Sequence, residues 1–142
     1  LIDIQNPRRV LRAWQVWAYT GRSILEWQHD TPSPILPLKA CTPILLTLNK
    51  DCLSKRIERR FKKMIECGVL EEAKINAKNW CPNAPSSKAI GAQELVSFTK
   101  GNISLDDATQ QITKATKKLA KRQRTWFRSN MKEWVKFEPK NF

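Results

Sequence analysis

The stretch SLDDATQQITKATKKLAKRQRTWFR, from Ser104 to Arg128, predicts one long helix around which the rest of the chain is organised. Ser104 is a favourable N-cap, and Asp107 three residues later completes a capping box. At about 100° per residue, a helix gathers one apolar stripe from this stretch. The stripe consists of Ala108, Ile112, Ala115, Leu119 and Trp126. We therefore expect a helix that packs along this stripe.

The opposite side of the helix is basic. It carries Lys114, Lys117, Lys121, Arg124 and Arg128, and no acid follows Asp107 in the stretch. A solvated face is one interpretation of such a run. Arg122 and Gln123 favour another, because they fall on the shoulders of the stripe, where a half-buried arginine needs an acceptor and a glutamine needs amide partners. A guanidinium fork beside an amide and Trp126 is typical of a nucleic-acid contact.

The composition limits the classes of partner. The chain has 142 residues with 41% hydrophobic residues, which is enough for one domain with a modest core. Its net charge of +13 favours a polyanionic partner, either nucleic acid or an acidic membrane surface. A membrane is the weaker choice, because no apolar run approaches the ~20 residues of a span and no signal peptide is evident.

The cysteines and the single histidine provide little for a metal site. Cys41, Cys52, Cys67 and Cys81 form no C-x-x-C pair, and His29 is the only histidine. We expect no structural zinc and reduced thiols in a cytoplasmic protein. No G-x-x-x-x-G-K-[ST] loop, Ser/His/Asp set or paired carboxylates stand out. The residues alone indicate a basic, mostly helical nucleic-acid-binding module, not a self-sufficient enzyme.

The N-terminal region predicts a second basic helix. Asn6-Pro7 is a helix start and Gly21 a helix stop. Arg8 and Arg12 lie opposite its apolar face, near a helix N-terminus that favours anions. Exposed arginines that only aid solubility are an equally good interpretation of this cluster. Ser23 to Gln28 predicts a further helical turn, before a proline-rich connection.

The middle of the chain predicts a strand and then a helix. Ile44 to Leu48 is short and apolar, so we expect a buried strand with parallel pairing. Asp51 is expected to cap a helix that ends at Cys67. Arg56 and Arg60 lie at the flank of its apolar stripe, where an arginine needs a carboxylate or a phosphate. A salt bridge and an anion contact both remain open.

The remaining elements complete a mostly α fold with two short strands. Val69 to Asn79 and Lys88 to Lys100 predict helices, and Trp134 to Phe137 predicts the second strand. Gly91 falls in the first turn of the later helix, where it costs up to ~1 kcal/mol and indicates a close backbone approach.

Three stretches carry a resemblance to a known family. NPRRVLRAWQVWAYTG (Asn6 to Gly21), KAIGAQEL (Lys88 to Leu95) and KRQRTWFR (Lys121 to Arg128) resemble tRNA-contacting signatures of the tRNA dimethylallyltransferases, the isopentenylpyrophosphate transferases. The segment RIERRFKKMIECGVLEE (Arg56 to Glu72) is similar to that family as well. The order is right, and the match covers nearly the whole chain.

The resemblance implies a fold and an activity. The family has a P-loop-type α/β core with a helical insertion, so residues 1–40 would belong to the tRNA-binding insertion and its connection, and residues 41–142 to the C-terminal part of the core. The family transfers a dimethylallyl group from dimethylallyl diphosphate to N6 of the adenosine 3′ of the anticodon, with Mg²⁺ assisting. Its P-loop and catalytic aspartate lie in an N-terminal half that this chain lacks. We therefore expect the fragment alone to be inactive.

The resemblance also assigns residues. The expected contacts with the tRNA anticodon stem-loop are Arg8, Arg9, Val10, Leu11, Arg12, Lys88, Ala89, Ile90, Gly91, Ala92, Gln93, Lys121, Arg122, Gln123, Arg124, Thr125, Trp126, Phe127 and Arg128. Arg56 and Arg60 would approach the diphosphate on the catalytic side, and no metal ligand is expected in this chain. Two departures weaken the match, since the family usually has an aromatic residue at Ala92 and Arg-Gln at Lys117 and Lys118.

Two other functions remain as alternatives. One is a stand-alone basic RNA-binding module without catalysis. The other is a related enzyme that prenylates free adenine nucleotides, although such an enzyme has little use for two arginine clusters. In each case we expect a cytoplasmic monomer that does not bind membranes.

Overall fold

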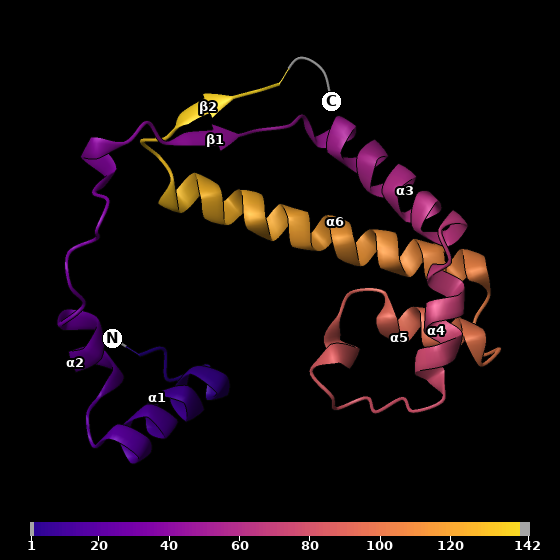
Figure 1. Ribbon diagram of the computed structural model, residues 1–142, viewed down its shortest axis with the longest axis horizontal. Helices are drawn as coiled ribbons and strands as arrows, with labels where there is room; N and C mark the ends of the chain where they lie inside the picture. Colours follow the sequence, from indigo (N-terminus) through magenta and orange to yellow (C-terminus); the bar gives the residue numbers. More distant parts are fainter. Residues whose placement is uncertain (1, 140–142) are drawn as a thin grey trace. The chain divides into compact units, whose positions relative to one another are not determined.

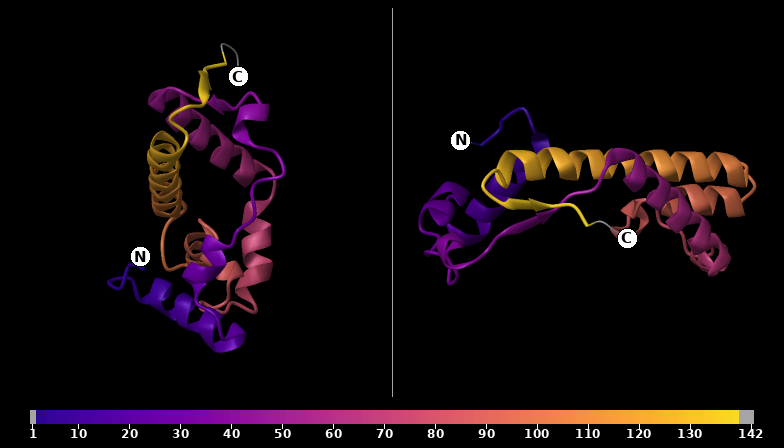
Figure 2. Two further views of the ribbon diagram at one scale, coloured as in Figure 1. Left: turned by 90° about the vertical axis from the view of Figure 1, so that its left-hand side faces the viewer. Right: turned by 90° about the horizontal axis from the view of Figure 1, so that it is seen from above.

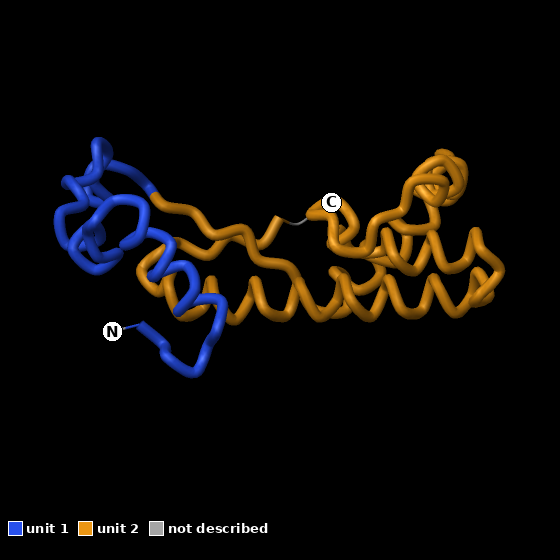
Figure 3. The backbone as a smooth tube through the Cα atoms, turned by 90° about the horizontal axis from the view of Figure 1, so that it is seen from below, with its two compact units in different colours: residues 1–42 blue, residues 43–142 orange. Residues whose placement is uncertain are grey.

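The computed structural model describes residues 2–139 of the 142-residue chain. Its elements in chain order are α1 (Pro7–Thr20), α2 (Ile24–His29), the 3₁₀ turn η1 (Leu38–Ala40), β1 (Ile44–Leu46), α3 (Lys50–Glu66), α4 (Val69–Ala77), the 3₁₀ turn η2 (Ser86–Lys88), α5 (Ala92–Thr99), α6 (Leu105–Asn130) and β2 (Val135–Phe137) (Figure 1). The prediction of a mostly helical chain with two short strands is confirmed. The chain divides into two compact units, residues 1–42 and residues 43–142 (Figure 3).

In the first unit, local capping sets the ends of both helices. The Arg9 backbone N–H donates to Asn6 Oδ1 (3.3 Å) at the start of α1, and Gly21 ends this helix in a left-handed conformation with φ 68°. Ser23 and Glu26 form a complete capping box at the start of α2. The predicted helix ends are therefore confirmed. No residue of either helix is buried, and the Trp14 and Trp17 side chains remain 60% and 58% exposed.

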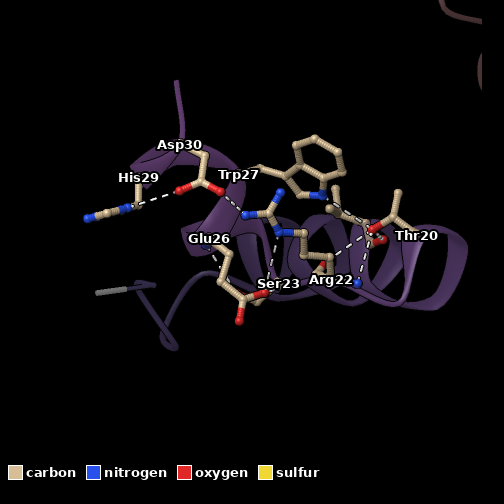
Figure 4. A network of polar contacts seen from close by, with 8 residues as sticks. Thr20, Arg22, Ser23, Glu26, Trp27, His29 and Asp30 are labelled. Atoms are coloured by element: carbon tan, nitrogen blue, oxygen red, sulfur yellow. Dashed lines mark hydrogen bonds and ion pairs between the residues drawn. The ribbon is translucent and has the colours of Figure 1, made fainter. Parts of the chain in front are cut away.

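A polar network holds α2 against the end of α1 (Figure 4). The Arg22 guanidinium forms an ion pair with Asp30 and lies 4.7 Å from the centre of the Trp27 ring. The Trp27 indole Nε1 donates to the Thr20 hydroxyl (3.3 Å). Hydrogen bonds from the His29 imidazole and then from Arg22 hold the pKa of the Asp30 carboxyl below its ordinary value. These contacts connect residues on both sides of the Gly21 turn.

The second unit has a small helical core. Phe61, Ala73, Leu95 and Ile112 are buried together, and Ile65, Val69 and Leu70 pack against them. α4 and α5 gather at the N-terminal half of α6, whose C-terminal half extends beyond them (Figure 1, Figure 2). Ala108 and Ile112 of α6 are therefore 0% and 4% exposed, whereas Trp126 is 54% exposed. The predicted apolar stripe is covered along only part of its length.

Gly91 has a different role from the one its position in the sequence indicated. It is the N-cap of α5, with φ 93°, and the preceding residues Ser86–Lys88 form a 3₁₀ turn. The prediction of a helix that starts at Lys88 is wrong, because the left-handed backbone at Gly91 interrupts it. A Cβ at Gly91 would lie 3.4 Å from the Ile112 side chain. The close approach that the glycine indicated is thus the packing of α6.

The strands pair in parallel, as predicted, but they are not buried. Ile44 pairs with Val135 and Leu46 with Phe137, and these four side chains are 52–65% exposed. Within the described residues neither strand packs on a helix. A parallel sheet normally has helices on both faces, so the predicted burial of the first strand is wrong for this chain taken by itself.

One predicted cap lies two residues from its observed place. The Asp51 backbone N–H donates to Asn49 Oδ1 (2.8 Å), so Asn49 caps α3 and Asp51 lies in the first turn. Asparagine and aspartate are about equally good N-caps. In this segment Asn49, which comes earlier in the sequence, is the residue that caps α3. α4 and β2 differ from their predicted bounds by one or two residues.

Candidate nucleic-acid interface

The three predicted tRNA-contacting stretches lie on α1, on the turn before α5 together with the start of α5, and on the C-terminal half of α6. The second and third belong to the same unit. Gly91 in the turn packs on Ile112 of α6, and Lys121 lies nine residues further along that helix, about 14 Å at ~1.5 Å per residue. α6 therefore connects two of the three stretches.

On α1 the basic side chains are accessible. Arg8, Arg9 and Arg12 are exposed, as are Val10 and Leu11 between them. Arg9 Nη1 lies 3.4 Å from Asp3 Oδ2, and its side chain is 67% exposed. Surface pairs of this kind contribute ~0–1 kcal/mol. The Arg9 guanidinium can exchange this carboxylate for a phosphate at small cost.

In the turn before α5, exposed and buried residues have different roles. Lys88, Ala89, Ile90 and Gln93 are exposed, whereas Gly91 is buried and Ala92 is half-buried. Gly91 is thus explained by its left-handed backbone (φ 93°) beside Ile112 of α6, without a ligand. The chemical groups offered to a partner here are the Lys88 ammonium of the turn and the Gln93 amide of the first turn of α5.

The C-terminal half of α6 presents cations and an indole together. Lys121, Arg122, Gln123, Arg124, Thr125 and Arg128 are exposed. Trp126 meets half-buried Phe127 edge-on, with ring centres 5.7 Å apart. A hollow of about 550 Å³ lies beside it, lined by Lys118, Lys121, Arg122, Thr125, Trp126, Ser129 and Asn130.

The expectation that Arg122 and Gln123 are half-buried is wrong, because α4 and α5 do not reach this part of α6. The same absence of cover leaves Trp126 accessible. An exposed indole between cationic side chains can stack on a nucleobase while the cations contact phosphates.

Arg56 and Arg60 on α3 are both exposed, so burial does not force either guanidinium to find a partner. Among the described residues Arg60 has no ion-pair partner, which leaves its guanidinium available for an anion. Arg60 also lines a cavity of about 260 Å³ together with Ile90, Gly91 and Ile112. The structure therefore brings Arg60 close to the turn before α5, a proximity that sequence spacing does not indicate.

Sequence reasoning missed a groove between α3 and α6. Its lining combines basic residues of both helices, including Lys50 at the first position of α3 and Lys118 of α6. Lys117 of α6 donates to Glu58 Oε1 of α3 across 2.7 Å. Lys118 belongs to the basic stretch that the sequence already showed in α6. The periodicity of a single helix could not show that Lys50, from another helix, lies beside that stretch.

Residues 2–139 contain no evident metal-binding cluster. No group of three or more His, Cys, Asp or Glu side chains in this range is arranged to hold one. Cys41, Cys52, Cys67 and Cys81 are free and exposed. Within the same range, none of the helices combines the length and the apolarity that crossing a bilayer requires.

These features define a basic, mostly helical protein whose cationic and aromatic side chains are exposed on α1 and α6. The family model described as IPP transferase matches residues 1–130. The chain belongs to the IPP transferase family. This assignment confirms the family resemblance of its sequence motifs.

Relatives of known name agree with this assignment. The chain is 48% identical to a tRNA dimethylallyltransferase of Ruegeria sp., over 97% of this chain and 48% of the relative. It is 49% identical to one of Cereibacter sphaeroides, over 94% of this chain and 46% of the relative. The chain thus spans about half the length of the curated relatives that it matches.

Solved structures are similar as well. A tRNA delta(2)-isopentenylpyrophosphate transferase of Staphylococcus epidermidis superposes with a TM-score of 0.64 at 28% identity, over 96% of this chain and 45% of that one. The full-length tRNA isopentenylpyrophosphate transferase of Bacillus halodurans gives 0.64 at 33% identity, over 94% of this chain and 39% of that one.

Proposed function

We propose that this chain is the C-terminal portion of a tRNA dimethylallyltransferase and that it supplies tRNA-binding and diphosphate-side residues. The whole enzyme would transfer a dimethylallyl group from dimethylallyl diphosphate to N6 of the adenosine 3′ of the anticodon. The observation that carries this proposal is the family match over residues 1–130, together with the names of the relatives. The exposed cations and indole of α6 support it independently.

Two parts of the chain, which nearly coincide with the two units, would have separate tasks. Residues 1–40 would belong to the tRNA-binding helical insertion and its connection, and residues 41–142 to the C-terminal part of a P-loop-type α/β core. The uncovered parallel strands support the second assignment, because such a sheet is normally extended and covered on both faces. Strands and helices from the rest of the enzyme would provide that cover.

The tRNA contacts would divide by chemistry. Arg8, Arg12 and Lys121 would contact phosphates, which position the RNA without reading its sequence. Gln123 has an amide suited to the edge of an adenine base, and Trp126 a ring on which a base can stack. The other residues of the three stretches would shape the surface around these contacts.

In the reaction, the adenosine N6 would attack C1 of the dimethylallyl group while the bond from C1 to the diphosphate oxygen breaks. N6 then loses a proton and the diphosphate leaves with the bonding electrons. Arg60, with its available guanidinium, would stabilise the developing charge on the diphosphate, and Arg56 would lie on the same side. Mg²⁺ would add positive charge there in the whole enzyme, but residues 2–139 offer no group to hold it, and we place no ligand in this chain.

We propose a monomer that acts in the cytoplasm on tRNA anticodon stem-loops. Purified alone, the chain should show no transfer of dimethylallyl groups to tRNA, because neither a P-loop nor a catalytic aspartate is identified in it. Measurable transfer by the purified chain would contradict the assignment of these parts to another segment.

Binding of the chain to two anticodon stem-loops, over a series of salt concentrations, tests the proposal directly. One loop carries adenosine 3′ of the anticodon and the other carries guanosine. A preference for adenosine that persists as salt rises would support base recognition by this half. Equal binding that vanishes with salt would mean that the chain supplies only charge, and no binding even at low salt would refute an RNA-binding role.

A further inference from the structure

The groove between α3 and α6 has basic rims along its length. Leu53 and Ile57 of α3 and Ala120 of α6 are half-buried and form its apolar floor. Its basic members are Lys50, Lys114, Lys117, Lys118, Lys121 and Arg124. The groove itself contains no acidic residue, and within α6 no acid follows Asp107.

The groove and the hollow beside Trp126 are neighbours on α6. Lys118 and Lys121 line both of them. From Trp126 back to Lys114 the helix rises about 18 Å, at ~1.5 Å per residue. That length accommodates several consecutive phosphates of a nucleic-acid strand.

One lysine of the groove is already engaged. Lys117 Nζ lies 2.7 Å from Glu58 Oε1, and the Lys117 side chain is 39% exposed, so this ion pair joins α6 to α3. Lys50, Lys114 and Lys118 are exposed and form no ion pair with any described residue. Counterions condensed on a nucleic acid are displaced by cations that are free to approach its phosphates.

We propose that this groove binds the sugar-phosphate backbone of the tRNA on one side of the base that contacts Trp126, and that Glu58 withholds Lys117 from it. The inference rests on the proposed function and adds a second phosphate-binding surface, built from Lys50, Lys114 and Lys118. The cations are strung along two helices instead of converging on one point. Such an arrangement suits a chain of phosphodiesters better than a single diphosphate.

The salt dependence of binding measures each lysine separately. Each phosphate contact contributes about 0.7–0.9 to the slope of log K against log salt concentration. We expect Lys114→Ala and Lys50→Ala each to lower the slope for the adenosine stem-loop by about that amount. Lys78→Ala, which removes an exposed lysine at the end of α4, is the matched control and should leave the slope unchanged. Lys114→Arg should retain the wild-type slope.

The ion pair between Glu58 and Lys117 allows a test in which a substitution should raise the salt slope of binding instead of lowering it. Lys117→Ala should lower the slope by less than half of the Lys114→Ala effect, because the ammonium is held by a carboxylate. Glu58→Gln should release Lys117 and raise the slope by up to about 0.9. The double variant Glu58→Gln, Lys117→Ala should lose that gain. Circular dichroism of each variant establishes that the helices are retained.

The outcomes separate this inference from the proposed function. If the folded chain binds the stem-loop but Lys114→Ala and Lys50→Ala match Lys78→Ala, the groove is not a phosphate site, while tRNA binding stands. If inorganic diphosphate displaces the RNA more strongly than chloride at equal ionic strength, and this advantage disappears in Lys114→Ala, the groove takes a single diphosphate and the inference is wrong. If the folded chain binds no RNA, both proposals fail.

Discussion

Gly91 and Ile112 show how a single residue connects a turn to the core. Gly91 has φ 93°, a region that costs an alanine roughly 1–2 kcal/mol, and a Cβ there would make an ordinary contact with Ile112 at 3.4 Å. We expect Gly91→Ala to lower the free energy of unfolding by about 1–2 kcal/mol, measured by denaturant titration. Gly101→Ala is the control, since Gly101 has φ 77° with no heavy atom within 4 Å of its Cβ position. Equal losses of unfolding free energy in the two variants would mean that the cost comes from the positive φ alone. If neither variant lost stability, the predicted backbone cost would be contradicted.

Asp30 offers a second prediction at the residue scale. Hydrogen bonds from His29, and to a smaller extent from Arg22, lower the pKa of its carboxyl. We expect His29→Ala to raise the Asp30 pKa toward its ordinary value, and Arg22→Ala to raise it less. Carboxyl NMR titration of the two variants measures both shifts.

The sign of the corresponding effect on stability follows from the lowered pKa. A carboxyl with a lowered folded-state pKa stabilises the fold above its unfolded-state pKa, and loses that stabilisation as pH falls through the folded-state pKa. The network around Arg22 should therefore be intact at neutral pH and weaken in acid, below the ordinary pKa of 3.8. A network that stays unchanged as pH falls well below 3.8 would contradict this account.

At the scale of elements, α6 combines a structural half and an exposed half. Its N-terminal half contributes Ile112, 4% exposed, to the small core. Burial of this kind predicts that Ile112→Ala lowers the free energy of unfolding by about 2–5 kcal/mol. Ile35→Ala should have almost no effect, because Ile35 is fully exposed. Thermal and denaturant unfolding of the two variants check the contrast, and similar losses would mean that the core lies elsewhere.

At the scale of the whole molecule, the β1–β2 pair is the least supported part of the second unit. Two parallel strands with uncovered faces are marginal in water. The Thr47 and Val135 N–H groups donate across the pair, to Phe137 O and Pro43 O. Amide hydrogen exchange should therefore show weak protection at Thr47 and Val135 and strong protection at Val96 and Ile112. Equal protection in the strands and in α6 would show that the pair is stable without further strands.

Most helix ends, the two strands and their parallel pairing were predictable from the sequence, whereas the start of α5 was not. Caps such as Asn6, Gly21 and Ser104 act on backbone groups only a few residues away, so local patterns determine them. The motifs that resemble the family are contiguous, and for the same reason they identified the family from sequence alone. The error at Asn49 arose because Asp51, two residues later, has nearly equal capping strength.

The burial of the candidate site depended on tertiary structure. Arg122, Gln123 and Trp126 are exposed because α5 packs beside the N-terminal half of α6 and does not reach them (Figure 1). Helical periodicity carries no information about where a neighbouring helix ends. Likewise Glu58 and Lys117, 59 residues apart, meet only because α3 packs on α6. The sequence by itself determined which side chains carry charge and on which side of each helix they lie. Only the packing of the helices decided which of those charges are paired, which line a common groove, and which remain free to meet a partner.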